Sequence, residues 1–398
     1  MRYRSQSRPG LLEPDRTASR GVRVAGVLTT IGDTPVVQLE RYLPDAPVQL
    51  WAKLESANPG GSAKDRPAAR MIDAAIASGQ LVAGDTVVES TSGNMGIGLA
   101  RACCYRDLRF VCIVDSRTNE LSVATMRALG AQVHVVSEPD RETGDLLTAR
   151  LHLVRRLLDE HPHWFRPDQY SNPANPESHR VGTMREIDEA LEGTLDYLFV
   201  AAGTTGTLGG CLAYITENRR HTRVVAVDAF GSVLFGGRAR ERKLPGMGAG
   251  VQPRLAEDLK PDLLVRVSDL DCVVGCRRLA RREAIVAGAS SGGVMLAIEQ
   301  TATTLPAGSV CAAILADNGA GYLGTVYDDD WVARELDCPP GQLDELVTIG
   351  RTKPPAVEGR SAAGSPSVHT RSGSGVPTAC SDGSSRAPAS VVDPRRGP

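Results

Sequence analysis

The 398-residue sequence contains no run of about 18 apolar residues, the length that a membrane-spanning helix needs. Its first 21 residues carry arginines but lack the apolar stretch of a signal peptide. We therefore expect a cytoplasmic protein with no membrane partner.

Metal-binding patterns are also missing. The nine cysteines form no CxxC pair, and the histidines show no spacing typical of metal ligands. We expect reduced, mostly buried thiols and no metal site.

The charge is nearly balanced, with a formal net charge of -2 and no basic block, which argues against nucleic acid as a partner. Lysine is scarce, since only five of the 45 basic residues are lysines. One of them, Lys64, lies in the small-residue loop "GGSAKDRPAARM" (60–71), just before a predicted helix. A solvated loop cation is the ordinary explanation, so the partners of this lysine decide its role.

Large apolar side chains are missing from one end of the chain. The stretch 351–398 has no Leu, Ile, Met, Phe, Tyr or Trp and is rich in Ser, Gly, Pro and Ala, so we expect a disordered tail. Residues 1–22 look similar and are expected to form a flexible arm. The rest of the chain is long enough for two domains.

Between these ends, short β-branched runs alternate with amphipathic stretches. The runs are "TVVES" (86–90), "FVCIVD" (110–115), "QVHVVS" (132–137), "DYLFVAAG" (196–203), "RVVAVDA" (223–229) and "VCAAILAD" (310–317). Their alternation predicts parallel strands with helical crossovers, an α/β fold with doubly wound sheets. One helix has readable ends, with Asn119 as its N-cap and Gly130 just after it.

In such sheets ligands bind beyond the carboxyl ends of the strands, so the loops that follow strands matter most. The loop "TSGN" (91–94) offers hydroxyls, an amide and free N–H groups at the start of a helix, which suits a carboxylate. An ordinary helix cap explains the same residues equally well.

A second loop, "GTTGT" (203–207), combines glycines that allow close approach with threonine hydroxyls, which suits a phosphate ester. It lacks the GK[ST] ending of a P-loop and the GxGxxG spacing of a dinucleotide site. We therefore do not expect a nucleotide.

A third loop, "GASSG" (288–292), fits the GxSxG pattern of α/β-hydrolases. Asp317 could serve as the acid of that fold, but the only histidine after Ser290 is His369, inside the low-complexity tail. The hydrolase interpretation fails for this reason, and we expect Ser290 to make a hydrogen bond instead.

A lysine in a small-residue loop, a phosphate cradle, a carboxylate loop and a serine together indicate pyridoxal phosphate (PLP). The chain resembles the fold type II PLP enzymes of the cysteine synthase and tryptophan synthase β group, from Thr29 to Tyr327. The resemblance is carried by "GDTPVVQL" (32–39), "NPGGSAKDRPA" (58–68), "TSGNMGI" (91–97), "QYSNPANPESH" (169–179), "GTTGT" (203–207) and "GASSG" (288–292).

The resemblance implies two three-layer α/β/α domains with the active site between them. The large PLP-binding domain would comprise residues 23–56 and 171–345, and a smaller, mobile domain residues 57–170. A homodimer is implied by the same analogy.

The resemblance also assigns roles to residues. Lys64 would form the Schiff base with PLP and carry the proton, Asn94 would bind the phenolic oxygen, and Ser290 the pyridine nitrogen. The cofactor phosphate would contact Gly203, Thr204, Thr205, Gly206 and Thr207. The substrate would contact Thr91, Ser92, Gly93, Gln169 and Tyr170. A neutral serine at the ring nitrogen fits loss of a β leaving group without a long-lived carbanion.

Within the family, "KDRPA", "ESTSGN", "VDAFGSVLFG" and "KLPGMGAG" are most similar to the 2,3-diaminopropionate branch. Those enzymes make N-(2-amino-2-carboxyethyl)-L-glutamate from O-phospho-L-serine and L-glutamate, for siderophores or peptide antibiotics. Two anionic substrates imply extra cations, for which Arg150 and Arg242 are candidates, although a solvated arginine explains each equally well. Gly203 departs from some of that branch, which have a serine there, and agrees with the cysteine synthases.

Three alternatives stay open. The first is a cysteine synthase using O-acetylserine or O-phosphoserine with sulfide, and the second is a serine or threonine dehydratase. The third is a cofactor-free scaffold that binds a partner protein, which intact Lys64, Asn94 and Ser290 argue against.

Overall fold

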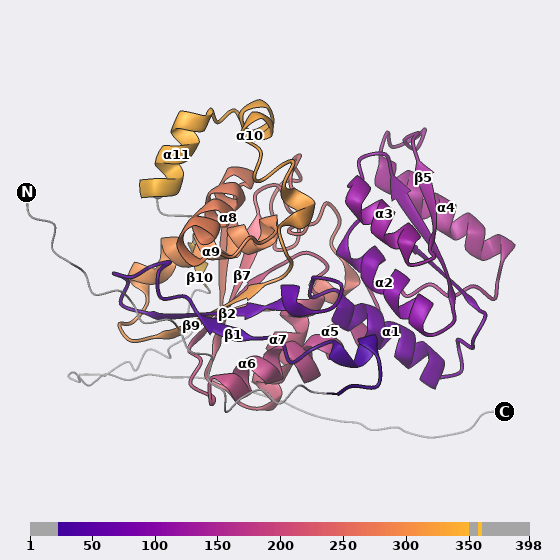
Figure 1. Ribbon diagram of the computed structural model, residues 1–398, viewed down its shortest axis with the longest axis horizontal. Coiled ribbons are helices and arrows are strands. Elements are labelled where there is room, and N and C mark those ends of the chain that lie inside the picture. The colour runs from indigo at the N-terminus through magenta and orange to yellow at the C-terminus, as the bar shows by residue number, and fades with distance from the viewer. Residues whose placement is uncertain (1–22, 350–356, 360–398) are drawn as a thin grey trace, which may run out of the picture. The chain divides into compact units, whose positions relative to one another are not determined.

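The computed structural model describes residues 23–349 and 357–359. This part of the chain contains a seven-stranded and a three-stranded sheet, each covered by helices (Figure 1). The expected flexible arm, residues 1–22, lies outside the described residues.

The larger sheet is parallel in its centre and antiparallel at both edges. In spatial order its strands are β1 (Val36–Gln38), β2 (Gln49–Leu54), β9 (Val310–Leu315), β6 (Tyr197–Ala201), β7 (Arg223–Ala229), β8 (Leu263–Val267) and β10 (Val357–Gly359). Only the pairs β1 with β2 and β8 with β10 are antiparallel. The five central strands therefore direct their carboxyl ends to the same edge.

Helices cover both faces of this sheet because its strands alternate their apolar side chains. On β7, Val225 and Val227 pack with α8 (Asp269–Glu283) and α9 (Ala289–Thr301). Val224 and Ala226 pack with α6 (Arg185–Ala190) and α7 (Gly206–Glu217) on the opposite face. The result is a three-layer α/β/α arrangement.

The smaller sheet is built the same way from β3 (Thr86–Ser90), β4 (Arg109–Asp115) and β5 (Gln132–Val136), all parallel. Helices α1 (Asp65–Ala77), α2 (Asn94–Tyr105) and α3 (Glu120–Ala128) share one apolar core with it. Helix α4 (Leu146–Glu160) packs on the other face. As predicted, Asn119 caps α3, since its Oδ1 accepts a hydrogen bond from the N–H of Leu121.

Shorter helices complete the described chain. They are α5 (Ala174–Ser178), the π-helix η3 (His179–Met184), α10 (Asp329–Leu336), α11 (Pro340–Ile349), and the 3-10 turns η1 (Val27–Thr30), η2 (Glu55–Ala57), η4 (Arg254–Ala256), η5 (Ala302–Thr304) and η6 (Ala320–Tyr322). None of the helices in the described residues is long and apolar enough to cross a membrane.

The predicted α/β class with doubly wound parallel sheets is confirmed. Strands β1, β2 and β8 were not predicted, because they are short or carry a charged residue in their interior. The expected disordered tail is wrong for Val357–Gly359, whose backbone pairs with the otherwise open edge of β8. The rest of that tail lies outside the described residues, and the division into two domains stays a prediction.

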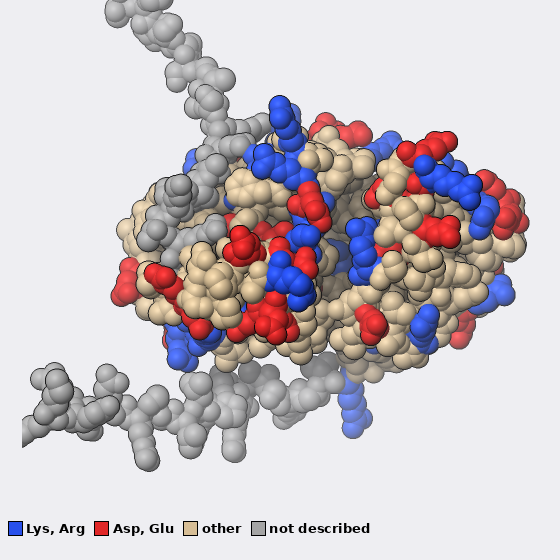
Figure 2. Space-filling view, turned by 90° about the horizontal axis from the view of Figure 1, so that it is seen from above, with Lys and Arg blue, Asp and Glu red and all other residues tan. Residues whose placement is uncertain are grey.

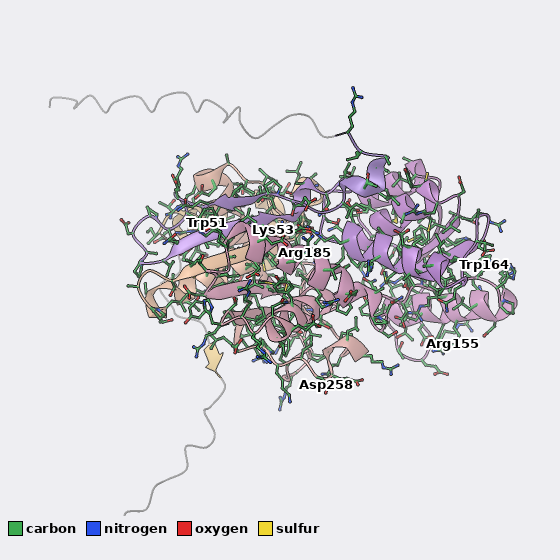
Figure 3. The ribbon with its side chains drawn as sticks, turned by 90° about the horizontal axis from the view of Figure 1, so that it is seen from below. Trp51, Lys53, Arg155, Trp164, Arg185 and Asp258 are labelled. Atoms are coloured by element: carbon green, nitrogen blue, oxygen red, sulfur yellow. The ribbon has the colours of Figure 1, made fainter. Side chains whose placement is uncertain are left out.

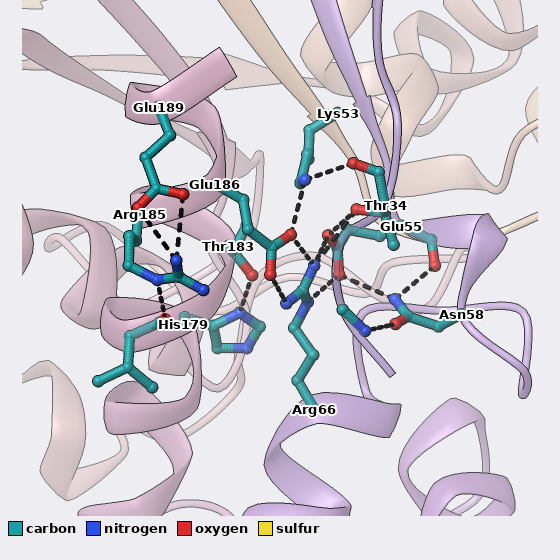
Figure 4. Close-up of polar contacts among 12 residues, drawn as sticks. Thr34, Lys53, Glu55, Asn58, Arg66, His179, Thr183, Arg185, Glu186 and Glu189 are labelled. Carbon is teal, nitrogen blue, oxygen red and sulfur yellow. Dashed lines mark hydrogen bonds and ion pairs between the residues drawn. The ribbon is translucent and has the colours of Figure 1, made fainter. Parts of the chain in front are cut away.

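A buried polar cluster joins β2, η2, α1 and α6 (Figure 4). We call it the Arg66 cluster; its members are Thr34, Lys53, Glu55, Arg66 and Glu186. Arg66 lies 2.7 Å from both Glu55 and Glu186, and Lys53 lies 2.7 Å from Glu186. Because Arg66 is the second residue of α1 and follows Lys64 by two residues, the cluster anchors the start of α1.

Candidate active site

A cavity lies at the carboxyl ends of β6 and β9, the edge at which parallel sheets bind ligands. It is bounded by the ends of these strands and by the loop before α1. Six residues singled out in the sequence line it: Lys64, Gly203, Thr204, Thr205, Thr207 and Ser290. The cavity therefore brings together three loops that are far apart in the chain.

Lys64 immediately precedes α1, and its carbonyl oxygen accepts a hydrogen bond from Ala68 N at 3.1 Å. Burial lowers the pKa of its ammonium, and the negative charges of Asp317 and Glu55 oppose that shift. A lysine whose pKa is lowered by burial holds more of the neutral amine, the form that acts as nucleophile or base.

The loop 203–207 ends at the start of α7, and Gly203, Thr204, Thr205 and Thr207 line the cavity. The first N–H groups of a helix have no partner within it and suit an anion. Thr205 adopts a left-handed conformation with φ of 66°, uncommon for a threonine. A side chain at Gly206 would have no room, since its Cβ would lie 2.0 Å from Asn175 Oδ1. This geometry forms a compact cradle for an anion such as phosphate.

A buried histidine, His179, contacts the cradle through Thr207. His179 Nε2 lies 3.2 Å from Thr207 Oγ1, and its Nδ1 lies 2.9 Å from Thr183 Oγ1. Burial, followed by the charges of Lys64 and Arg66, holds the pKa of His179 well below its usual value. The ring is therefore neutral and can fix the hydroxyl of Thr207. Sequence reasoning gave it no role, although it belongs to the motif at 169–179.

The structure distinguishes the two serines of the "GASSG" loop. Ser290 lines the cavity at the start of α9, whereas Ser291 Oγ accepts a hydrogen bond from Ala316 N at 3.0 Å. Gly246 lies opposite Ser290, and a Cβ added there would come within 3.7 Å of the Ser290 hydroxyl. Ser290 is thus the serine available to a ligand.

Asn94 begins α2, and its Nδ2 donates a hydrogen bond of 2.8 Å to Asp317 Oδ2. Asp317 is buried, and burial raises its pKa. In the sequence this residue was considered only as the acid of a rejected hydrolase. The only signal that marked it was an aspartate just after the apolar run of β9.

The predicted substrate-carboxylate residues are not among those that line the cavity. Thr91 is buried, Ser92 is exposed, and Gly93 leads into Asn94 at the N-terminus of α2. Gln169 is buried, and its carbonyl oxygen accepts a hydrogen bond from Asn175 Nδ2 at 2.7 Å. Their role as substrate contacts stays a prediction.

The two candidate arginines differ from the solvated arginines of the ordinary explanation. Arg150, on α4, is buried with its Nη1 3.4 Å from Asp115 Oδ2, and its Nε and Nη1 have no hydrogen-bond partner. Arg242 also has a buried Nη1 without such a partner, beside Gly248. Burial raises the pKa of the Tyr170 hydroxyl, on which the charges of Glu89 and Arg150 also act.

The surface carries both signs of charge around a depression. In Figure 2 a hollow runs down the middle of the view, with Lys and Arg as well as Asp and Glu side chains along it. This mixture differs from the one-signed surface that nucleic acid requires.

The groups at the cavity match what PLP needs. A lysine amine, a helix N-terminus with threonine hydroxyls and a neutral serine hydroxyl can hold its aldehyde, phosphate and ring nitrogen. Within the described residues, no group of three His, Cys, Asp or Glu side chains could hold a metal ion.

Comparison with known proteins gives the same picture. Residues 27–317 match the family described as pyridoxal-phosphate dependent enzyme. The chain is 40% identical over 308 residues to N-(2-amino-2-carboxyethyl)-L-glutamate synthase of Ralstonia nicotianae, covering 77% of this chain and 91% of the relative.

Solved structures are similar as well. O-ureido-L-serine synthase superposes with a TM-score of 0.70 at 34% identity, covering 78% of this chain and 100% of that one. The O-acetylserine dependent cystathionine beta-synthase from Helicobacter pylori gives a TM-score of 0.71 at 29% identity, covering 76% and 98%.

Proposed function

We propose that this chain, which belongs to the family of pyridoxal-phosphate dependent enzymes, joins O-phospho-L-serine to L-glutamate. The reaction breaks the bond between Cβ and the phosphate oxygen and forms a bond from Cβ to the glutamate nitrogen. The products are N-(2-amino-2-carboxyethyl)-L-glutamate, phosphate and a proton. The relative from Ralstonia nicotianae, named for this product, supports the proposal.

The observation that carries the choice of substrates is the burial of Arg150. Its Nε and Nη1 have no hydrogen-bond partner in the described residues, and its nearest carboxylate, Asp115, is 3.4 Å away. A buried guanidinium with unused donors is costly unless a ligand completes it. A phosphate or carboxylate oxygen can accept a hydrogen bond from such a donor, and both substrates carry such groups.

Lys64 would hold the cofactor, the cradle of Gly203 to Thr207 its phosphate, and Asn94 and Ser290 its ring. When bound, PLP withdraws electrons from the substrate's α carbon, so that the α proton becomes acidic and a β leaving group can depart. Ser290 is a neutral group and does not keep the ring nitrogen protonated, which suits elimination rather than a persistent carbanion.

Lys64 is the residue that moves the proton. Its amine, with a pKa lowered by burial, takes the α proton as general base and returns it when the product forms. Thr91, Ser92, Gly93 and Gln169 would orient the substrate carboxylate. Tyr170 and Arg150 would contact the more distant anionic group.

A cysteine synthase is the second candidate. It is supported by Gly203, which agrees with the cysteine synthases, and by the similarity to the O-acetylserine dependent enzyme from Helicobacter pylori. A serine or threonine dehydratase is the third.

One experiment separates these activities. The purified protein is mixed with O-phosphoserine or O-acetylserine, and with glutamate, sulfide or no acceptor, and the products are identified by mass. We expect the glutamate adduct from O-phosphoserine as the fastest reaction. Cysteine as the main product would favour the sulfhydrylase, and pyruvate with ammonia in the absence of an acceptor would favour the dehydratase.

We also propose a homodimer in the cytoplasm, with residues 57–170 closing on the substrate carboxylate. The mass of the protein in solution tests whether it is a homodimer. A monomer that retains full activity would contradict it.

A further inference from the structure

One short segment, Ala316 to Asn318, connects the loops that form the cavity. The N–H of Ala63 donates to Ala316 O at 2.7 Å, and the N–H of Asn318 donates to Gly61 O at 3.1 Å. On the other side, the N–H of Gly288 donates to Asp317 O at 3.2 Å. The backbone around Asp317 is thus held between the loop of Lys64 and the loop of Ser290.

The Asp317 side chain reaches the third element of the site. Its Oδ2 accepts hydrogen bonds from Asn94 Nδ2 at 2.8 Å and from the Tyr322 hydroxyl at 3.0 Å. Its Oδ1 is buried and has no hydrogen-bond partner in the described residues. The side chain is only 4% exposed, so water does not compete for these contacts.

Asp317 Oδ2 accepts two hydrogen bonds and therefore acts as an acceptor towards Asn94. Facing Asp317, Asn94 must therefore present its amide nitrogen and not its oxygen. This nitrogen has two hydrogens, of which one is used by Asp317 and the second remains for another acceptor. If this acceptor were lost, the amide could rotate by half a turn and present its oxygen instead.

We propose that Asp317 is a positioning residue that fixes the Asn94 amide so that its second N–H points to the cofactor's phenolic oxygen. Asp317 itself touches neither substrate nor cofactor in this role and acts through Asn94. The inference rests on the proposed function only in that Asn94 is assigned to PLP; it does not depend on which substrates are used.

The test compares Asp317→Asn, Asn94→Ala and the double variant as holoenzymes without substrate. The visible absorption of bound PLP reports hydrogen bonding at its phenolic oxygen. We expect Asp317→Asn to shift absorbance from the long-wavelength band towards the near-ultraviolet band, and to lower kcat about tenfold with little change in KM. In the Asn94→Ala background, the same substitution should change neither quantity further.

Asn119→Ala is the matched control, because it removes another side-chain hydrogen bond, 2.8 Å from Asn119 Nδ2 to Gly321 O, near the same segment. It should leave the band ratio unchanged. If Asp317→Asn does not fold, Asp317→Ala is measured in the same way.

Three results would overturn the proposal. They are an unchanged spectrum in both Asp317 variants, an equal effect of Asp317→Asn with and without Asn94, or an equal shift in Asn119→Ala. A wild-type protein that binds no PLP would instead contradict the proposed function, so the two failures are distinguishable.

Discussion

The chain contains two sets of buried polar groups that differ in how the groups are paired. In the Arg66 cluster, Arg66 binds Glu55 and Glu186, and Lys53 binds Glu186 and Thr34. By contrast, Asp317, which faces Asn94, and Glu89 and Arg150, on β3 and α4, each keep a buried polar atom without a hydrogen-bond partner. A fully paired network stabilises one conformation, whereas an unpaired buried group is costly unless a ligand completes it.

The carboxylates of the two sets show the same contrast. Burial alone would raise the pKa of Glu186, but hydrogen bonds and charges from Arg66 and Lys53 lower it to about 2. Burial raises the pKa of Glu89 and of Asp317, and their partners do not reverse the shift. The ionised form of Glu186 therefore stabilises the fold. Ionisation of Glu89 or Asp317 instead costs folding free energy.

Substitution of Lys64, at the candidate site, and of Lys53, in the Arg66 cluster, should separate the functional from the structural role most strongly. Lys64→Ala should lower kcat by about a thousandfold or more, because it removes both the cofactor's lysine and the general base, while the melting temperature stays near that of the wild type. The matched control is Lys53→Ala, in the Arg66 cluster, which should lose stability but keep its turnover. Lys53, a residue of β2 in the seven-stranded sheet, is labelled in Figure 3. Retained β-replacement by Lys64→Ala would disprove its assignment.

Neutralising Glu186 should have the next largest effect, on stability. Glu186→Gln leaves Lys53 and Arg66 short of a buried negative charge, which should cost about 3 kcal/mol in the free energy of unfolding. Since the folded pKa of Glu186 is below the unfolded value of about 4.3, its contribution is complete above that pH. It is lost as the pH falls towards about 2.

Urea unfolding at several pH values measures this effect. The curves of wild type and Glu186→Gln should converge as the pH falls through that window. Glu189→Gln is the control, because Glu189 is exposed and pairs with Arg185 on the surface (Figure 4). It should change stability by less than about 0.5 kcal/mol. An equal loss of unfolding free energy in both variants would show that Glu186 contributes no more to stability than an exposed glutamate.

Removing the buried guanidinium of Arg150 should weaken substrate use without weakening the fold. Arg150→Met should lower kcat/KM for O-phosphoserine by about 10- to 100-fold, the effect of one charged hydrogen bond. Arg155→Met changes an exposed arginine on the same helix and should have no effect (Figure 3). Steady-state kinetics with O-phosphoserine measures kcat/KM of both variants. A loss of stability in Arg150→Met with unchanged kinetics would make Arg150 a structural residue.

The smallest expected effect has the opposite sign to that of Glu186. A carboxyl group whose folded pKa is raised adds stability only at low pH, and this is lost as the pH rises through the folded pKa. Glu89→Gln should therefore melt at the same temperature as the wild type in acid and slightly higher at neutral pH. Melting temperatures of both proteins, measured from acid to neutral pH, test the sign of this difference. A lower melting temperature at neutral pH would show that Arg166, 3.4 Å away, stabilises Glu89 after all.

Much of the fold follows from local patterns in the sequence. The runs at 86–90 and 223–229 coincide with β3 and β7, and Asn119 caps its helix as predicted. β2 was missed because Lys53 interrupts its apolar pattern. That lysine is tolerated in the core only because Glu186, far away in the sequence, pairs with it.

The sequence by itself determined which loops carry ligand-binding chemistry, since glycines, hydroxyls and a lysine after strands are local features. Only the tertiary structure decided that Lys64, the loop 203–207 and Ser290 meet at one cavity, that Arg150 is buried, and that Asp317 faces Asn94. The physical reason is that burial and hydrogen-bond pairing depend on contacts between distant segments. The same side chain is a solvated ion or a costly unpaired charge according to what packs against it.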